Sequence, residues 1–197
     1  MTTKKLARTR RATAFHEAGH AVIGWRYGNM LRDGGVSISV DGFEGLTNMR
    51  PLATPDEVSL LTAAGFGRAH QFQQALIHKA EAEIVCALAG PIAERRFLKL
   101  PTTGPLRYIE GCPNDPASDL TRVRALLTAI YGVGDHGFAQ SLLQERTKRQ
   151  MRDQRTWAAI SEMANKLVQS GRLTPDQAED IPKKHGVPPT RRLWIAR

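Results

Sequence analysis

The residues of this chain that are best suited to chemistry lie near its start, in the segment His16-Glu17-Ala18-Gly19-His20. In an α-helix, residues four positions apart lie on one face, one turn from each other, so both imidazoles can bind one metal ion. Histidine nitrogens are preferred ligands of zinc, which lowers the pKa of a bound water to about 7. Glu17 follows the first histidine and can accept a proton from that water. The pattern predicts a zinc-dependent hydrolase in which His16 and His20 bind Zn²⁺ and Glu17 is the general base.

A catalytic zinc site needs a third protein ligand, which this motif does not supply. Aspartate, glutamate and histidine residues further along the chain are the candidates. The remaining histidines follow no ligand pattern; they are His70, His78, His136 and His185. No Gly-x-x-His follows His20 at the spacing that some zinc peptidases use. From the residues alone, the identity of the third ligand stays open.

Hydrophobic periodicity predicts the elements that position the motif. A helix over about residues 7–26 carries it, and Gly28 and Asn29 mark the end of this helix. Residues 36–40 alternate between apolar and polar and predict a strand. Residues 45–49 return as a second strand after a turn. This small sheet has two possible roles, either to hold an extended peptide along its edge or only to cover the helix.

The rest of the chain has helical patterns. Residues 51–67 and 101–113 are predicted to be loops. Asp115 is predicted to cap a helix that begins at Pro116. The other predicted helices cover about residues 69–98, where Pro91 should kink or split the helix, and residues 138–149, 157–169 and 175–181. The predicted fold class is a mainly α (α+β) domain with a small β-sheet near the N-terminus.

The composition restricts the class of protein. The 197 residues are 41% hydrophobic, which suffices for a sizeable core, and 28 Lys and Arg against 19 Asp and Glu give a net charge of +9. No nucleic-acid-binding motif accompanies this charge, so nucleic acid is not the expected partner. No run approaches the ~20 apolar residues of a membrane span. Two cysteines, Cys86 and Cys112, without a Cys-x-x-Cys pair fit a reducing compartment. We expect a cytoplasmic protein without a membrane span, with Cys86 in the core.

Residues 14–22 (Ala-Phe-His-Glu-Ala-Gly-His-Ala-Val) resemble the peptidase domain of FtsH, the membrane-anchored AAA+ zinc protease. Residues 88–94 (Leu-Ala-Gly-Pro-Ile-Ala-Glu) are similar to that family's Leu-Gly-Gly-Arg-Ala-Ala-Glu, and residues 102–104 to its Thr-Thr-Gly. Residues 117–120 (Ala-Ser-Asp-Leu) resemble the segment with the family's third zinc ligand, an aspartate on a helix. The resemblance covers about residues 12–182.

The resemblance implies that Asp119 is the third zinc ligand. About ten extra residues lie between the Thr-Thr-Gly segment and this aspartate, so Asp115 stays an alternative ligand. Glu94 matches a glutamate of the family. It is expected either to orient a metal ligand or to be an ordinary charge on a helix surface.

Two hypotheses follow. The first is a zinc metalloendopeptidase that hydrolyses peptide or protein substrates, without ATP by itself because the ATPase module and membrane anchors of FtsH are absent. A separate unfoldase and an oligomeric assembly stay open as partners. The alternative is a catalytically silent zinc-binding module that binds a protein or nucleic acid through its basic surface. The expected organisation is a basic arm over residues 1–11, the FtsH-like domain over 12–185 and a basic tail over 186–197.

Overall fold

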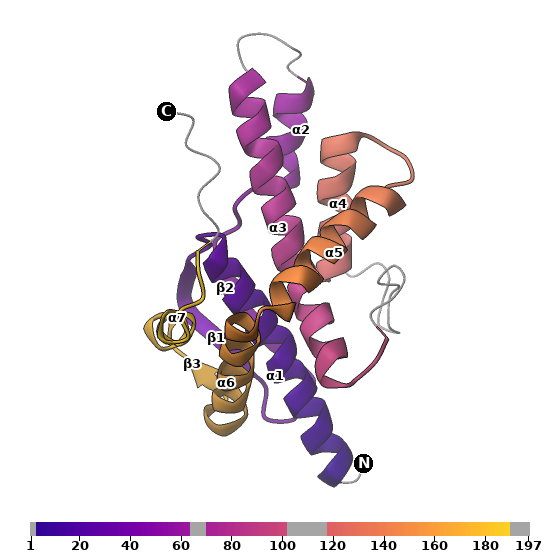
Figure 1. Ribbon diagram of the computed structural model, residues 1–197. Coiled ribbons are helices and arrows are strands. Elements are labelled where there is room, and N and C mark those ends of the chain that lie inside the picture. The colour runs from indigo at the N-terminus through magenta and orange to yellow at the C-terminus, as the bar shows by residue number, and fades with distance from the viewer. Residues whose placement is uncertain (1–2, 64–69, 102–117, 190–197) are drawn as a thin grey trace.

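The computed structural model describes residues 3–63, 70–101 and 118–189, which form seven helices and one small sheet (Figure 1). The two longest helices lie at the centre of the molecule, and the sheet lies beside the first of them. The helices are α1 (Thr3–Arg26), α2 (Pro55–Ala63), α3 (His70–Phe97), α4 (Asp119–Tyr131), α5 (Gly137–Arg152), α6 (Gln154–Ser170) and α7 (Pro175–Lys184). The strands are β1 (Leu31–Ile38), β2 (Gly45–Met49) and β3 (Arg172–Leu173). The predicted mainly α fold class is confirmed.

Small residues let α1 and α3 approach closely. A Cβ atom added to Gly19 would lie 2.7 Å from the carbonyl oxygen of Ala89 and 2.8 Å from the Cβ of Ala93. Real Cβ atoms do not come this near to other heavy atoms. The mid-helix glycine, which destabilises a helix by about 1 kcal/mol relative to alanine, therefore has a packing reason. The contact brings the histidine-bearing face of α1 against α3.

The sheet has the strand order β2-β1-β3, and both pairs are antiparallel. Val36 of β1 is opposite Thr47 of β2 on one side and Leu173 of β3 on the other. The strand β2 therefore lies at an edge of the sheet. Its bounds agree with the prediction, whereas β1 begins at Leu31 and ends at Ile38. The strand β3 was not predicted, because two residues are too few to produce a periodic pattern.

The prediction of a loop over residues 51–67 is wrong, because α2 lies within it. Thr54 and Glu57 form reciprocal hydrogen bonds: the amide of Thr54 donates to Oε2 of Glu57 at 2.8 Å, and the amide of Glu57 donates to Oγ1 of Thr54 at 3.3 Å. This is a capping box, and Pro55 fits the first helical position that follows it. Val58 is buried and fixes the helix to the core.

The proline inside α3 does not split this helix, and α4 begins later than predicted. The helix α3 runs as one element through Pro91, so it is not split. The residues around this proline are buried, and their packing offsets the roughly 3 kcal/mol that a proline costs inside a helix. The helix α4 begins at Asp119, with Ser118 as its cap: Oγ of Ser118 accepts from the amide of Thr121 at 3.2 Å. The predicted cap, Asp115, lies outside the described residues.

A single hydrophobic core extends from α1 to Val187, which follows α7. Its largest fully buried side chains come from α1, α3, α4, α5, α6 and α7. Each buried Leu, Ile or Met side chain stabilises the fold by about 1.5–3 kcal/mol. Cys86 is buried in this core, as predicted. Among the residues that the structure describes, no helix is long and apolar enough to cross a membrane.

Candidate metal centre

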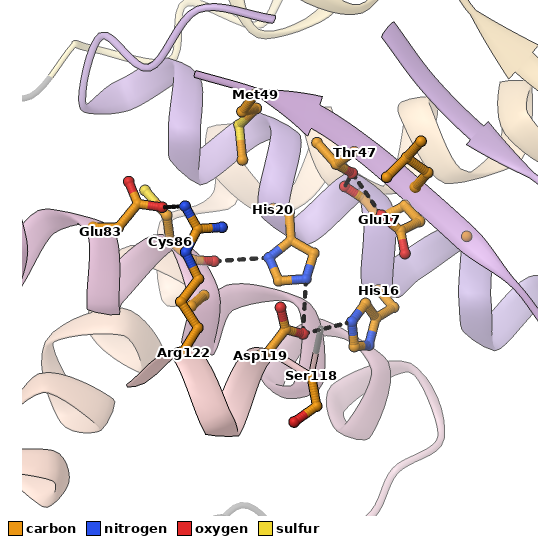
Figure 2. A pocket seen from close by; sticks show the side chains of 13 residues that line it. His16, Glu17, His20, Thr47, Met49, Glu83, Cys86, Ser118, Asp119 and Arg122 are labelled. Atoms are coloured by element: carbon orange, nitrogen blue, oxygen red, sulfur yellow. Dashed lines mark hydrogen bonds and ion pairs between the residues drawn. The ribbon is translucent and has the colours of Figure 1, made fainter. Parts of the chain in front are cut away.

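His16, His20 and Asp119 point toward one another where α1 meets the first turn of α4 (Figure 2). The two imidazole rings are one helical turn apart, with their centroids separated by 4.8 Å. The Oδ2 atom of Asp119 lies 3.0 Å from Nε2 of each histidine. The three candidate ligand atoms all lie within 4.8 Å of one another. Residues from positions 16, 20 and 119 thus form one compact cluster.

The second ring nitrogen of each histidine is held by α3. Nδ1 of His20 donates to the backbone carbonyl of Cys86 at 2.8 Å, and Nδ1 of His16 donates to Oε2 of Glu94 at 3.0 Å. A carbonyl or carboxylate oxygen only accepts, so both Nδ1 atoms carry a proton. This fixes the orientation of the rings and directs both Nε2 atoms to Asp119, as is typical of metal-binding histidines. Of the two roles expected for Glu94, the geometry agrees with orientation of a ligand.

The electrostatics of the cluster favour positive charge between these groups. Burial lowers the pKa of His16, but hydrogen bonds to Asp119 and Glu94 outweigh it and raise the pKa to about 10. Burial also opposes the charged form of His20, yet the charge of Asp119 raises its pKa. Burial disfavours the charged form of the Asp119 carboxyl as well, but the two histidines bring its pKa well below the usual range. The carboxylate of Asp119 therefore favours the protonated form of both histidines when no other cation lies between them.

The residues fit a zinc ion. Two imidazole nitrogens and one carboxylate oxygen are an accepted donor set. Tetrahedral bonds of about 2.1 Å require ligand atoms about 3.4 Å apart, comparable with the 3.0 Å between Oδ2 of Asp119 and each Nε2. Gly90 of α3 keeps the space in front of these atoms open. A Cβ atom added there would lie 2.7 Å from Nε2 of His16 and even closer to Nε2 of His20. Only glycine leaves this space clear.

Glu17 lies beside the cluster without belonging to it. Its side chain is held by strand β2: Oγ1 of Thr47 donates to Oε2 of Glu17 at 2.6 Å. Gly45 lets strand β2 approach the side chain of Glu17, since a Cβ atom at Gly45 would lie 2.5 Å from Cγ of Glu17. Glu17 is 7% exposed and lines the same cleft as the histidines. It is therefore placed to exchange protons with a molecule bound next to the cluster.

The cleft has a volume of about 420 Å³ and lies between α1, β2, α3 and α4. Strand β2 forms one wall. On another wall, the buried carboxylate of Glu83 pairs with Arg122 (Figure 2). This carboxylate also accepts from the amide of Leu52 at 2.9 Å. Burial raises the pKa of Glu83, and the charge of Arg122 opposes this rise. The pair joins α3 to α4 one turn after Asp119. The described lining residues are His16, Glu17, His20, Gly45, Leu46, Thr47, Met49, Glu83, Cys86, Ala87, Ser118, Asp119 and Arg122.

The structure brings together four of the residues singled out in the sequence, His16, Glu17, His20 and Asp119, with Glu94 directly behind them. Asp115 lies outside the described residues. Three other histidines are held elsewhere: His78 beside Glu81, His136 at the start of α5 and His185 against Glu162.

Sequence reasoning missed Thr47, the carbonyl of Cys86 and the role of Gly90 in the site. A backbone carbonyl has no sequence signal. Gly90 did have one, because a glycine inside a helical pattern indicates close approach of another element.

Comparisons of the chain with protein-family models, with curated proteins and with solved structures each found no match. The interpretation of the site therefore depends on its own residues and geometry.

Proposed function

We propose that this protein is a zinc-dependent metallopeptidase. The observation that carries the proposal is the convergence of His16, His20 and Asp119 on one point, with Glu17 beside them in an open cleft. A structural zinc site is usually closed by four protein ligands. Three protein ligands next to a cleft and a carboxylate are typical of a catalytic site instead. The resemblance to FtsH supports this proposal. It implies that Asp119 is the third zinc ligand, and Asp119 lies in the cluster with both histidines.

In the proposed reaction, His16, His20 and Asp119 hold the metal. A bound zinc ion supplies the Lewis acidity that activates a water molecule and polarises the scissile carbonyl. Glu17 accepts a proton from the attacking water and transfers it to the leaving amine. Thr47 orients this carboxylate through its hydroxyl. Glu94 and the carbonyl of Cys86 keep the Nε2 atoms of the histidines directed to the metal.

The edge strand supports a peptide as the substrate. β2 is an outer strand of the sheet, and four of its residues line the cleft: Gly45, Leu46, Thr47 and Met49. An extended peptide can add to such an edge by main-chain hydrogen bonds, which brings a peptide bond past the metal. We therefore infer an endopeptidase that acts on unstructured segments. Folded substrates would need a separate unfoldase.

The second candidate, a silent zinc-binding module, would bind zinc but would not cleave a protein substrate. Purified protein is assayed for zinc content and for cleavage of casein, an unstructured protein, with and without a chelator. The peptidase predicts about one zinc per chain and cleavage that stops on chelation and returns with zinc. Zinc without cleavage of casein or of a peptide library would favour the silent module. Chelator-resistant cleavage would contradict the metallopeptidase.

A further inference from the structure

A second pocket lies on the face of α3 away from the metal cluster, where α3 and α5 end side by side. Its volume is about 320 Å³, within the roughly 300–1,000 Å³ of small-molecule sites. Four of the seven described lining residues are cations, and none is acidic. They are Arg96 and Lys99 from the end of α3, Lys148 and Arg152 from α5, and the apolar residues Ile92, Leu100 and Met151.

Arg96 and Arg152 lie close enough to repel each other. The pKa of Arg96 is lowered first by burial and then by the charge of Arg152. The side chain of Lys148 is only 9% exposed. Glu145 is a nearby carboxylate, 2.6 Å from Nζ of Lys148 and 3.9 Å from Nη2 of Arg152. Asp153 is engaged with Arg26 instead, at 3.4 Å.

Part of this charge has a structural role. Arg96 donates to the carbonyl of Met151 and lies over the ring of Trp157, at 3.9 Å from its centroid. The C-terminal ends of two helices also attract cations, each with about half a negative charge. The four cations exceed Glu145 and both helix ends by about two charges. A bound dianion would neutralise this excess of about two positive charges.

The backbone of Lys99, one of the four cations, has an unusual left-handed conformation. This residue has φ 56° and is the only non-glycine residue with positive φ in the described part of the chain. It ends α3 in a Schellman motif: its amide donates to the carbonyl of Arg96 at 3.2 Å, and the amide of Leu100 donates to the carbonyl of Arg95 at 2.9 Å. Glycine is the usual residue at this position, and a lysine there is strained. The strained residue is thus one of those that line the pocket.

We propose that this pocket binds a phosphate group. Phosphate is a dianion near neutral pH, and the guanidinium groups of arginines match the spacing of its oxygens. The exposed side chain of Leu100 can contact an apolar body attached to that phosphate. Two sources share this chemistry, free inorganic phosphate and a small organic phosphomonoester. The site is separate from the metal cleft, and the proposal does not depend on the proposed function.

The test is a calorimetric titration of zinc-loaded full-length protein with inorganic phosphate, phenyl phosphate and benzoate at constant ionic strength. We expect saturable binding of one phosphate per chain and much weaker binding of benzoate, a monoanion. Phenyl phosphate that binds more tightly than phosphate would identify an organic phosphomonoester as the source, and equal affinities would identify free phosphate. Absence of saturable binding of both phosphates would overturn the proposal.

Variants assign the binding to this pocket. Arg152→Gln and Lys99→Gly should each weaken phosphate binding by about tenfold, as expected for one lost charge-assisted contact. Lys99→Gly should at the same time raise the Tm of the ligand-free protein by about 2–4 °C, because it removes the left-handed strain. The matched control Lys79→Gln removes a charge from an exposed position of the same helix and should bind phosphate normally. Equal weakening in all three variants, or unchanged affinity in Lys99→Gly, would contradict the site.

Discussion

Asp119 and His20 are 99 positions apart in the sequence, yet Oδ2 of the aspartate lies 3.0 Å from Nε2 of the histidine. The contact depends on two local features. His20 is turned toward α4 by the carbonyl of Cys86, and Ser118 caps α4 so that Asp119 is its first residue. The third candidate ligand is thus provided by the tertiary structure.

Replacement of Asp119 by asparagine should weaken zinc binding by at least about a hundredfold, because it removes the proposed anionic ligand. The measurement is competition against a chromogenic chelator. Asp180→Asn is the matched control, since Asp180 is an exposed aspartate of α7. The Asp180→Asn variant should bind zinc with the same affinity as the native protein.

The same assay decides between the two aspartates that the sequence left in play. Asp115→Asn should leave zinc affinity unchanged if Asp119 is the ligand. Zinc lost by Asp115→Asn and kept by Asp119→Asn would reverse the assignment.

Gly90→Ala should exclude the metal while the helix stays intact. The added methyl group would lie 2.7 Å from Nε2 of His16, in the space that the metal needs. Alanine favours a helix over glycine by about 1 kcal/mol, so a weaker helix would not explain the loss. Zinc content and far-UV circular dichroism are the two measurements. Gly134→Ala, at a position with nothing within 4 Å of the added carbon, is the control and should keep its zinc. Full zinc binding by Gly90→Ala would show that the metal lies elsewhere.

Glu94→Gln should reduce zinc affinity by about 10–100-fold without abolishing binding, because Glu94 is proposed to orient His16 and not to bind the metal itself. A neutral amide is a weaker partner for the Nδ1 proton of His16. The comparison is with Glu179→Gln, on the surface of α7, which should have no effect. A loss in Glu94→Gln as large as that in Asp119→Asn would instead make Glu94 a direct ligand.

Glu162 should stabilise the fold only above acidic pH. Its carboxylate on α6 accepts from Lys184 at 3.0 Å and from His185 at 2.8 Å, which tie the end of α7 to α6. The hydrogen bond from Lys184, aided by His185 and Lys166, lowers its pKa from 4.5 to about 2. Because the folded pKa lies below the unfolded one, the stabilisation is complete above 4.5 and is lost as the pH falls toward 2.

Glu162→Gln should therefore lower the Tm by a few degrees at pH 7, about what a network of partly exposed ion pairs contributes. The difference from the native protein should shrink when melting is repeated at acidic pH. The exposed Glu44 provides the control variant Glu44→Gln, with no change expected. A difference in Tm that does not depend on pH would rule out this electrostatic explanation.

The sequence predicted most of the candidate site. The spacing of His16 and His20 requires one helix face, and the resemblance of residues 117–120 pointed to Asp119, which the structure brings to the cluster. The hydrogen bond from Thr47 to Glu17 was not predictable, because it depends on how β2 crosses α1. The same holds for the carbonyl of Cys86, since no side chain signals a backbone contact. These contacts follow from packing between elements far apart in the chain.

The fold was predicted where periodicity extends over several turns or along a strand. The fold class and β2 agree with the structure. The helix α2 was missed because its residues are rich in turn formers, although Thr54 and Glu57 carry the signature of a capping box. Pro91 does not split α3, since burial on both sides of it outweighs the local preference. The loop predicted at α2 was an error because local turn formers were given more weight than capping.

The proposed peptidase activity is tested most directly by Glu17→Gln. This change removes the proposed proton acceptor but none of the three proposed metal ligands, and the amide can still accept a hydrogen bond from Thr47. Native protein and variant, each loaded with one zinc per chain, are compared for cleavage of casein. We expect equal zinc affinity and a rate lower by at least about a hundredfold in the variant. Undiminished cleavage by the zinc-loaded variant would contradict it.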